Sequence, residues 1–140
     1  MAIETTYGQA RSAYAAIMAL SRMNLQIPLS AALRWKRIAG LLRPLEEQAA
    51  ELEREIGDRY MERDAAGQPK PDPMGRLQVQ PDKIAAYNKE IAAVGKEPIT
   101  VGSDLVKITD LGADMEGTIG SSVVGYLEML GPFLEDTPAG

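Results

Sequence analysis

The part of the sequence best suited to chemistry is a group of basic side chains around the single tryptophan, Trp35. Cationic side chains neutralise phosphates and an indole ring stacks on a nucleobase, so the group could bind nucleic acid. The same cations could instead contact an acidic protein partner. Trp35 is in phase with Ile38 and Leu42, which favours a third interpretation, that the indole belongs to the core. The candidate partner-binding side chains are Arg22, Arg34, Lys36, Arg37 and Arg43.

Carboxylates are the other abundant reactive groups, and six of them follow closely in the sequence. They are Glu46, Glu47, Glu51, Glu53, Glu55 and Asp58. Paired carboxylates can act as general acid and base, but these lie on the polar side of a helical repeat, which indicates a solvated face. The glycine spacing at residues 112–119 resembles a phosphate-binding loop, but Thr118 replaces its essential lysine.

The chain contains no histidine and no cysteine. This composition excludes catalytic triads built on histidine, thiolate nucleophiles, disulfides, and metal ligation by imidazole or thiolate. We therefore expect that the protein is not an enzyme, and that it has no catalytic residues, metal site or cofactor.

The two ends of the chain differ in charge. Residues 1–43 hold six basic side chains and one acidic one, whereas residues 44–140 hold nine basic and nineteen acidic ones, which gives about +5 and −10. One interpretation is ordinary solvated helix surface. The other is a polar subunit that meets an acidic neighbour or nucleic acid at one end and a basic neighbour at the other.

The elements that carry these side chains begin with a helix predicted over residues 5–23. Thr5 or Thr6 is placed to cap its N-terminus. Pro28 interrupts the helical pattern, and Ser30 is placed to cap the next helix.

The second helix carries the strongest periodic pattern in the chain. Apolar side chains alternate at spacings of 3 and 4 residues, at Trp35, Ile38, Leu42, Leu45, Ala49, Leu52 and Ile56. This heptad spacing predicts a narrow packing seam. Pro44 falls inside the pattern and removes a backbone hydrogen bond. We therefore expect a kink near Leu42 or two abutting helices, residues 30–42 and 44–63.

A loop and a further helix follow this seam. Residues 64–80 contain three prolines and two glycines, and residues 76–80 could form one short strand. The next helix starts at Pro81 and stops at Gly95, with apolar residues at the same heptad spacing. The two seams predict an antiparallel hairpin of coiled-coil type. Its seam residues are Leu45, Ala49, Leu52, Ile56, Ile84, Tyr87 and Ile91.

The remaining residues predict short strands within 98–109, able to pair with residues 76–80, and a final helix over 121–130. The expected fold class is mainly α: an antiparallel helical hairpin with an additional N-terminal helix and a small β element. We expect a single domain, residues 1–140. It would comprise the N-terminal helix (1–28), the hairpin with its Pro/Gly loop at 64–80 (29–94), and the short strands, final helix and tail (95–140).

The order of these parts suggests a family resemblance. IPLSAALRWKRIAGLL, LEEQAAELEREIGDRY, DAAGQPKPDPMGRLQV and PDKIAAYNKEI follow one another within residues 27–109. In this arrangement the chain resembles an uncharacterised family of small phage-encoded helical-hairpin proteins, although residues 93–96 lack the acidic character typical of that stretch. The family has no agreed activity and offers no functional residues. The resemblance implies a phage gene product and a virion or assembly component.

We therefore predict a structural or adaptor subunit of a phage particle that acts by protein–protein interaction. Two alternatives stay open. One is a transient assembly chaperone or scaffold, for which seven methionines would supply an adaptable surface. The other is a nucleic-acid-binding accessory protein. The expected partners are other chains of an assembly, including copies of the protein itself, and not a membrane. The expected location is the host cytoplasm during assembly and then the virion.

Overall fold

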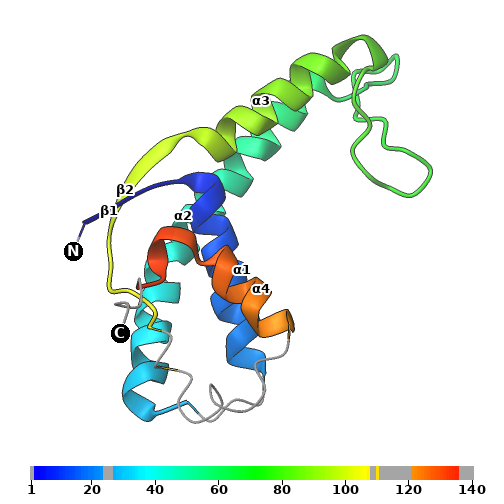
Figure 1. Cartoon of the computed structure of the whole chain (residues 1–140). Helices are drawn as coiled ribbons and strands as arrows, with labels where there is room; N and C mark the ends of the chain where they lie inside the picture. The colour runs from blue at the N-terminus through cyan, green and yellow to red at the C-terminus, as the bar shows by residue number, and fades with distance from the viewer. Residues whose placement is uncertain (1, 24–26, 108–109, 111–120, 136–140) are drawn as a thin grey trace.

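The molecule consists of a base and an arm that extends from it (Figure 1). The longest element, helix α2 (Leu29–Tyr60), contributes to both. The computed structural model describes residues 2–23, 27–107, 110 and 121–135. The N-terminal half of α2 packs in a base, and its C-terminal half runs outward beside α3 as an arm with residues 61–80 at the tip (Figure 1). The other elements are β1 (Ala2–Thr6), α1 (Tyr7–Arg22), η1 (Pro81–Lys83), α3 (Ile84–Lys96), β2 (Pro98–Gly102), α4 (Ser121–Met129) and η3 (Gly131–Phe133).

The core lies in the base, where α1 packs between α2 and α4. Helix α1 buries three alanines on this face, Ala10, Ala13 and Ala16, and such small side chains allow neighbouring helices to approach closely. Helix α1 also buries Ile17 and Leu20, and its neighbours supply the other large side chains. The fully buried ones include Trp35, Ile38 and Leu42 of α2 and Leu130 and Phe133 after α4.

The N-terminus of α1 follows a short strand that the sequence did not predict. Thr6 caps α1, as predicted, because its Oγ1 accepts a hydrogen bond from the backbone N–H of Gln9 at 3.2 Å. Strand β1 pairs antiparallel with β2, with Ile3 opposite Val101. Ile3 and Thr5 are buried and Glu4 is exposed, so β1 has the alternation of a strand with one covered face.

The predicted strand at residues 76–80 is wrong. Within this segment Val79 forms only an isolated antiparallel bridge with Met61, because the tip chain turns back on the end of α2. Strand β2 pairs with β1 instead, as the two-stranded sheet of the base. Further along, Val106 forms an isolated parallel bridge with Leu134, while residues 108–109 of the second predicted strand lie outside the described residues.

Helix α2 is continuous through Pro44, so the prediction of two abutting helices is wrong. Proline cannot donate the bond that the Gly40 carbonyl would receive. Pro44 and Gly40 are both exposed, so water can satisfy that carbonyl. Ser30 is not the N-cap either: α2 begins at Leu29, Pro28 occupies the cap position, and no side chain caps the helix.

The final helix α4 and helix α3 agree with the predicted elements to within a few residues. The predicted mainly α class with a small β element is confirmed. Among the described residues, no helix combines the length and apolarity needed to cross a bilayer. The candidate phosphate-binding loop at 112–119 and the tail after residue 135 lie outside the described residues.

Candidate functional site: the arm and the outer surface of α2

The basic group around Trp35 does not form a nucleobase-stacking site, because the indole is in the core. Trp35 is 2% exposed, as the core interpretation predicted. The neighbouring Arg34 binds Asp110, with 2.6 Å between Nη1 and Oδ1. Arg37 forms a longer ion pair with Asp104, at 3.5 Å.

The remaining candidate cations stay at the surface. Arg43 pairs with Glu47 one turn later, at 3.2 Å, with both side chains about two-thirds exposed. Arg22 and Lys36 are also exposed. Exposed ion pairs contribute only about 0 to 1 kcal/mol, so the charges of Arg37 and Arg43 are available to a partner as well.

Asp110 is a buried carboxylate that joins the segment after β2 to helix α2. Its Oδ2 accepts hydrogen bonds from Trp35 Nε1 and from the backbone N–H of Lys107, each at 3.0 Å. Burial raises the pKa of Asp110, but the hydrogen bonds from Lys107, Trp35 and Arg34 outweigh it and hold the pKa below its ordinary value. The carboxylate is therefore ionised and acts as a structural anchor rather than as an acid.

The predicted hairpin seam is formed only in part. Ala49 and Ile56 are buried, and Leu45 packs against the core. Leu52 and Ile84, by contrast, are 41% and 48% exposed, so their prediction as buried seam residues is wrong. The other two residues of the α3 seam, Tyr87 and Ile91, are half-buried, and α3 as a whole contains no fully buried residue.

An ion-pair cluster explains why the seam departs from its predicted register. Arg11 of α1 binds both Glu46 and Glu53 of α2. These two carboxylates are about one-third exposed, so their prediction as part of a solvated face is wrong. Because α1 contacts this side of α2, the buried stripe of α2 shifts toward Glu46 and Glu53 and leaves Leu52 at the edge.

Polar and aromatic contacts hold the outer part of the arm. The rings of Tyr60 and Tyr87 meet edge to face, with 6.3 Å between centroids, and Arg59 pairs with Glu90 at 3.3 Å. Desolvation and the nearby Glu90 carboxylate raise the pKa of Tyr60, so this phenol is neutral at physiological pH. The arm therefore relies on a few specific contacts rather than on a large apolar core.

The arm tip is built from two turns with the same construction. Asp64 Oδ1 accepts hydrogen bonds from the backbone N–H groups of residues 66 and 68, and Asp72 Oδ1 does the same for residues 74 and 76. Each turn ends at a glycine with positive φ, Gly67 at 79° and Gly75 at 78°, a conformation that glycine adopts without steric cost. The repeated D-x-x-G pattern thus folds the loop into an ordered tip.

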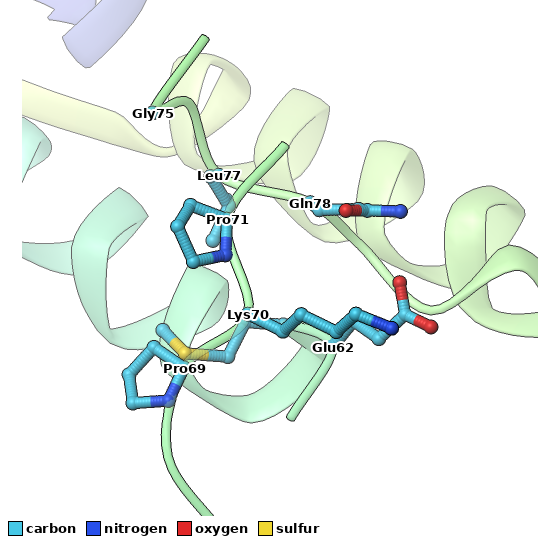
Figure 2. Close-up of a pocket in the computed structure, with 8 residues that line it drawn as sticks. Glu62, Pro69, Lys70, Pro71, Gly75, Leu77 and Gln78 are labelled. Atoms are coloured by element: carbon cyan, nitrogen blue, oxygen red, sulfur yellow. The ribbon is translucent and has the colours of Figure 1, made fainter. Parts of the chain in front are cut away.

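Between these turns lies a mainly apolar pocket of about 280 Å³, bounded by Pro69, Pro71 and Leu77 (Figure 2). The Oε2 atom of Glu62, also in its lining, is buried and has no hydrogen-bond partner among the residues that the structure describes. Met74, on the second turn, is 76% exposed. A concave apolar surface with an adjacent exposed methionine is suited to receiving an apolar side chain of another protein.

The sequence reasoning missed the pocket and the Asp110 anchor. The pocket could have been suspected from the repeat of DAAG and DPMG eight residues apart, since each is an Asp–Gly turn signal. No comparable signal marked Asp110, because its partners Arg34 and Trp35 are 76 and 75 residues away.

A scan against protein-family models found no match, and searches of curated proteins and of solved structures found no similar protein.

Proposed function

We propose that the protein is a structural or adaptor subunit of a phage particle and that the arm tip binds another protein chain of the assembly. The observation that carries the proposal is the apolar pocket at the end of an arm that extends away from the base (Figure 1). A contact at the tip would join two bodies at a distance, which is the task of an adaptor.

The composition of the arm supports a protein partner. Met74 and Leu77, 76% and 46% exposed, give the tip an apolar surface, and such surface gains free energy when a partner removes it from water. The two Asp–Gly turns preorganise this surface, so binding would cost little conformational entropy.

The test compares two substitutions to aspartate, each introduced into the gene for this protein in the phage that encodes it. Met74→Asp places a charge at the tip, and Val124→Asp, at a 44% exposed position on α4, is the control in the base. We expect quantitative mass spectrometry to find the wild-type and control chains in purified particles and the Met74→Asp chain depleted by at least about tenfold. Equal amounts of all three chains would contradict a role for the tip. Absence of the wild-type chain from particles would contradict the subunit function.

The same measurement separates the proposal from its alternatives. A transient assembly chaperone or scaffold would be present in assembly intermediates and absent from mature particles. A nucleic-acid-binding protein would show an affinity for DNA or RNA that falls steeply with salt. Because Trp35 is buried, its indole cannot stack on a nucleobase, so a nucleic-acid-binding function would not use this side chain.

A further inference from the structure

One face of α2 is exposed along the whole helix. Its residues follow helical spacing, and every one of them is exposed: Leu29, Leu33, Lys36, Arg37, Gly40, Arg43, Pro44, Glu47, Glu51, Arg54, Glu55 and Asp58. We name this set the outer face. Helix α2 has 32 residues, so the face runs for about 48 Å at 1.5 Å per residue.

The outer face is divided by charge. Its N-terminal half carries three cations, Lys36, Arg37 and Arg43, and no acid. Its C-terminal half carries four acids and one cation, in the order Glu47, Glu51, Arg54, Glu55 and Asp58. A helix face with opposite charges at its two ends complements the same face turned end for end.

At the junction between the halves the face carries Gly40 and Pro44, with Arg43 of the basic half beside Pro44. An added Cβ at Gly40 would meet no atom within 4 Å. This part of the helix surface is therefore solvent-accessible and has no side chain that projects from it. Leu41, at the edge of the junction, is 45% exposed. A second helix can therefore approach closely at the junction and cover apolar surface there.

We propose that a second copy of this chain docks on the outer face, with the two α2 helices antiparallel and crossing between Gly40 and Pro44. A two-fold axis at this point places Arg37 of each copy opposite Glu47 of the other. Each basic half then faces an acidic half, and the interface is isologous, as in most homodimers. A parallel arrangement would instead set like charges against each other, which costs several kcal/mol.

The existing ion pairs of these side chains do not prevent the docking. Arg37 is paired with Asp104 at 3.5 Å, with its side chain 63% exposed, and Arg43 is paired with Glu47 at 3.2 Å. Because both pairs are solvent-exposed, they are worth about 0 to 1 kcal/mol. An interface that excludes water between opposite charges would strengthen the electrostatic interaction.

The test uses charge reversal on the full chain, measured by size-exclusion chromatography with light scattering at low ionic strength. We expect the wild-type chain to have twice the mass of 15.1 kDa. The variants Lys36→Glu/Arg37→Glu and Glu47→Lys/Glu51→Lys should each be monomeric, because each places like charges across the crossing. We expect a rise in Kd of at least about a hundredfold for each. An equimolar mixture of the two variants should recover the dimer, since their charges are again complementary.

Matched controls change the same charges elsewhere. Lys83→Glu/Lys89→Glu and Glu4→Lys/Asp82→Lys alter exposed positions outside the outer face and should leave the dimer intact. Circular dichroism confirms that all variants are folded. A monomeric wild-type chain, a dimer that survives either outer-face variant, or a mixture that stays monomeric would each overturn the antiparallel docking.

This inference deepens the proposed function by naming one partner, and its test is independent of the arm tip. Met74→Asp should leave the dimer unchanged while it reduces incorporation into particles. A monomeric wild-type chain that still enters particles would refute the docking and leave the subunit function standing. A dimeric chain that is absent from particles would refute the subunit function alone.

Discussion

Removal of the Asp110 carboxylate tests whether this anchor holds the base together. Asp110 is 5% exposed and accepts hydrogen bonds from Arg34, Trp35 and the backbone N–H of Lys107. In Asp110→Ala the buried indole N–H loses its acceptor, which costs about 1 to 3 kcal/mol. Arg34, with 23% of its side chain exposed, remains partly hydrated and adds about 1 kcal/mol. We expect Asp110→Ala to lower the free energy of unfolding by about 3 kcal/mol.

The assay is urea unfolding of the full chain, followed by tryptophan fluorescence because Trp35 itself contacts the anchor. Asp110→Asn is the matched control: it keeps the shape and one acceptor oxygen but removes the charge, so its loss should be clearly smaller, about 1 to 2 kcal/mol. A change of less than about 0.5 kcal/mol for Asp110→Ala would refute the reasoning. Equal losses for both variants would assign the effect to the charge rather than to the acceptors.

Three further outcomes follow from burial, ionisation and close contact. Ile56→Ala should lower the free energy of unfolding, measured with denaturant, by about 2 to 4 kcal/mol, because Ile56 is 7% exposed. Leu52→Ala should lower it by about 1 kcal/mol or less, because Leu52 is 41% exposed. The stabilisation from Asp110 should be complete above its ordinary pKa of 3.8 and should be lost as the pH falls through its lower folded-state pKa. The stability difference between wild type and Asp110→Asn should therefore shrink in acid, and a difference that is constant with pH would contradict the shift. Gly8→Ala would bring its Cβ to 2.9 Å from a backbone carbonyl of α3 and should lower the melting temperature, while Gly102→Ala, with no atom within 4 Å, should not.

The helices and much of the core could be predicted because local patterns determine them. The apolar residues Trp35, Ile38 and Leu42 recur at helical spacing and are all buried, and the Pro and Gly residues around 64–80 correctly marked the turn between two helices. The Asp–Gly pairs of the tip also act locally, within four residues of each other. In these places the chain's preference over a few residues agrees with the whole fold.

The failures occur where distant residues decide the outcome. The helical spacing places Leu52 in the seam and Glu53 on the solvated face. In the structure, Arg11, which lies 42 residues before Glu53, binds the Glu53 carboxylate and holds it against α1. Strand β1 has only five residues, so its alternation alone is too short to identify it. Its partner strand, residues 98–102, returns to the base only after the whole arm in sequence. Pro44 was expected either to kink α2 near Leu42 or to divide it into two helices. The helix is not divided, because an interior proline is tolerated where solvent can bond the freed carbonyl.

The contacts of Gly8 and the β1–β2 pair hold the two ends of the arm, and this determines how the length of the arm could vary. The chain leaves the base along α2 and returns to it along α3, where Gly95 lies against Gly8 and β2 completes the sheet with β1. The arm is therefore a helical hairpin whose two ends are both held by the base, comparable to an insertion in the base. Adding one heptad to each of α2 and α3 would move the tip outward by about 10 Å without altering any contact of the sheet. Homologues, or designed variants, could thus set the distance between base and tip in steps of a heptad, so that the hairpin serves as an adjustable spacer.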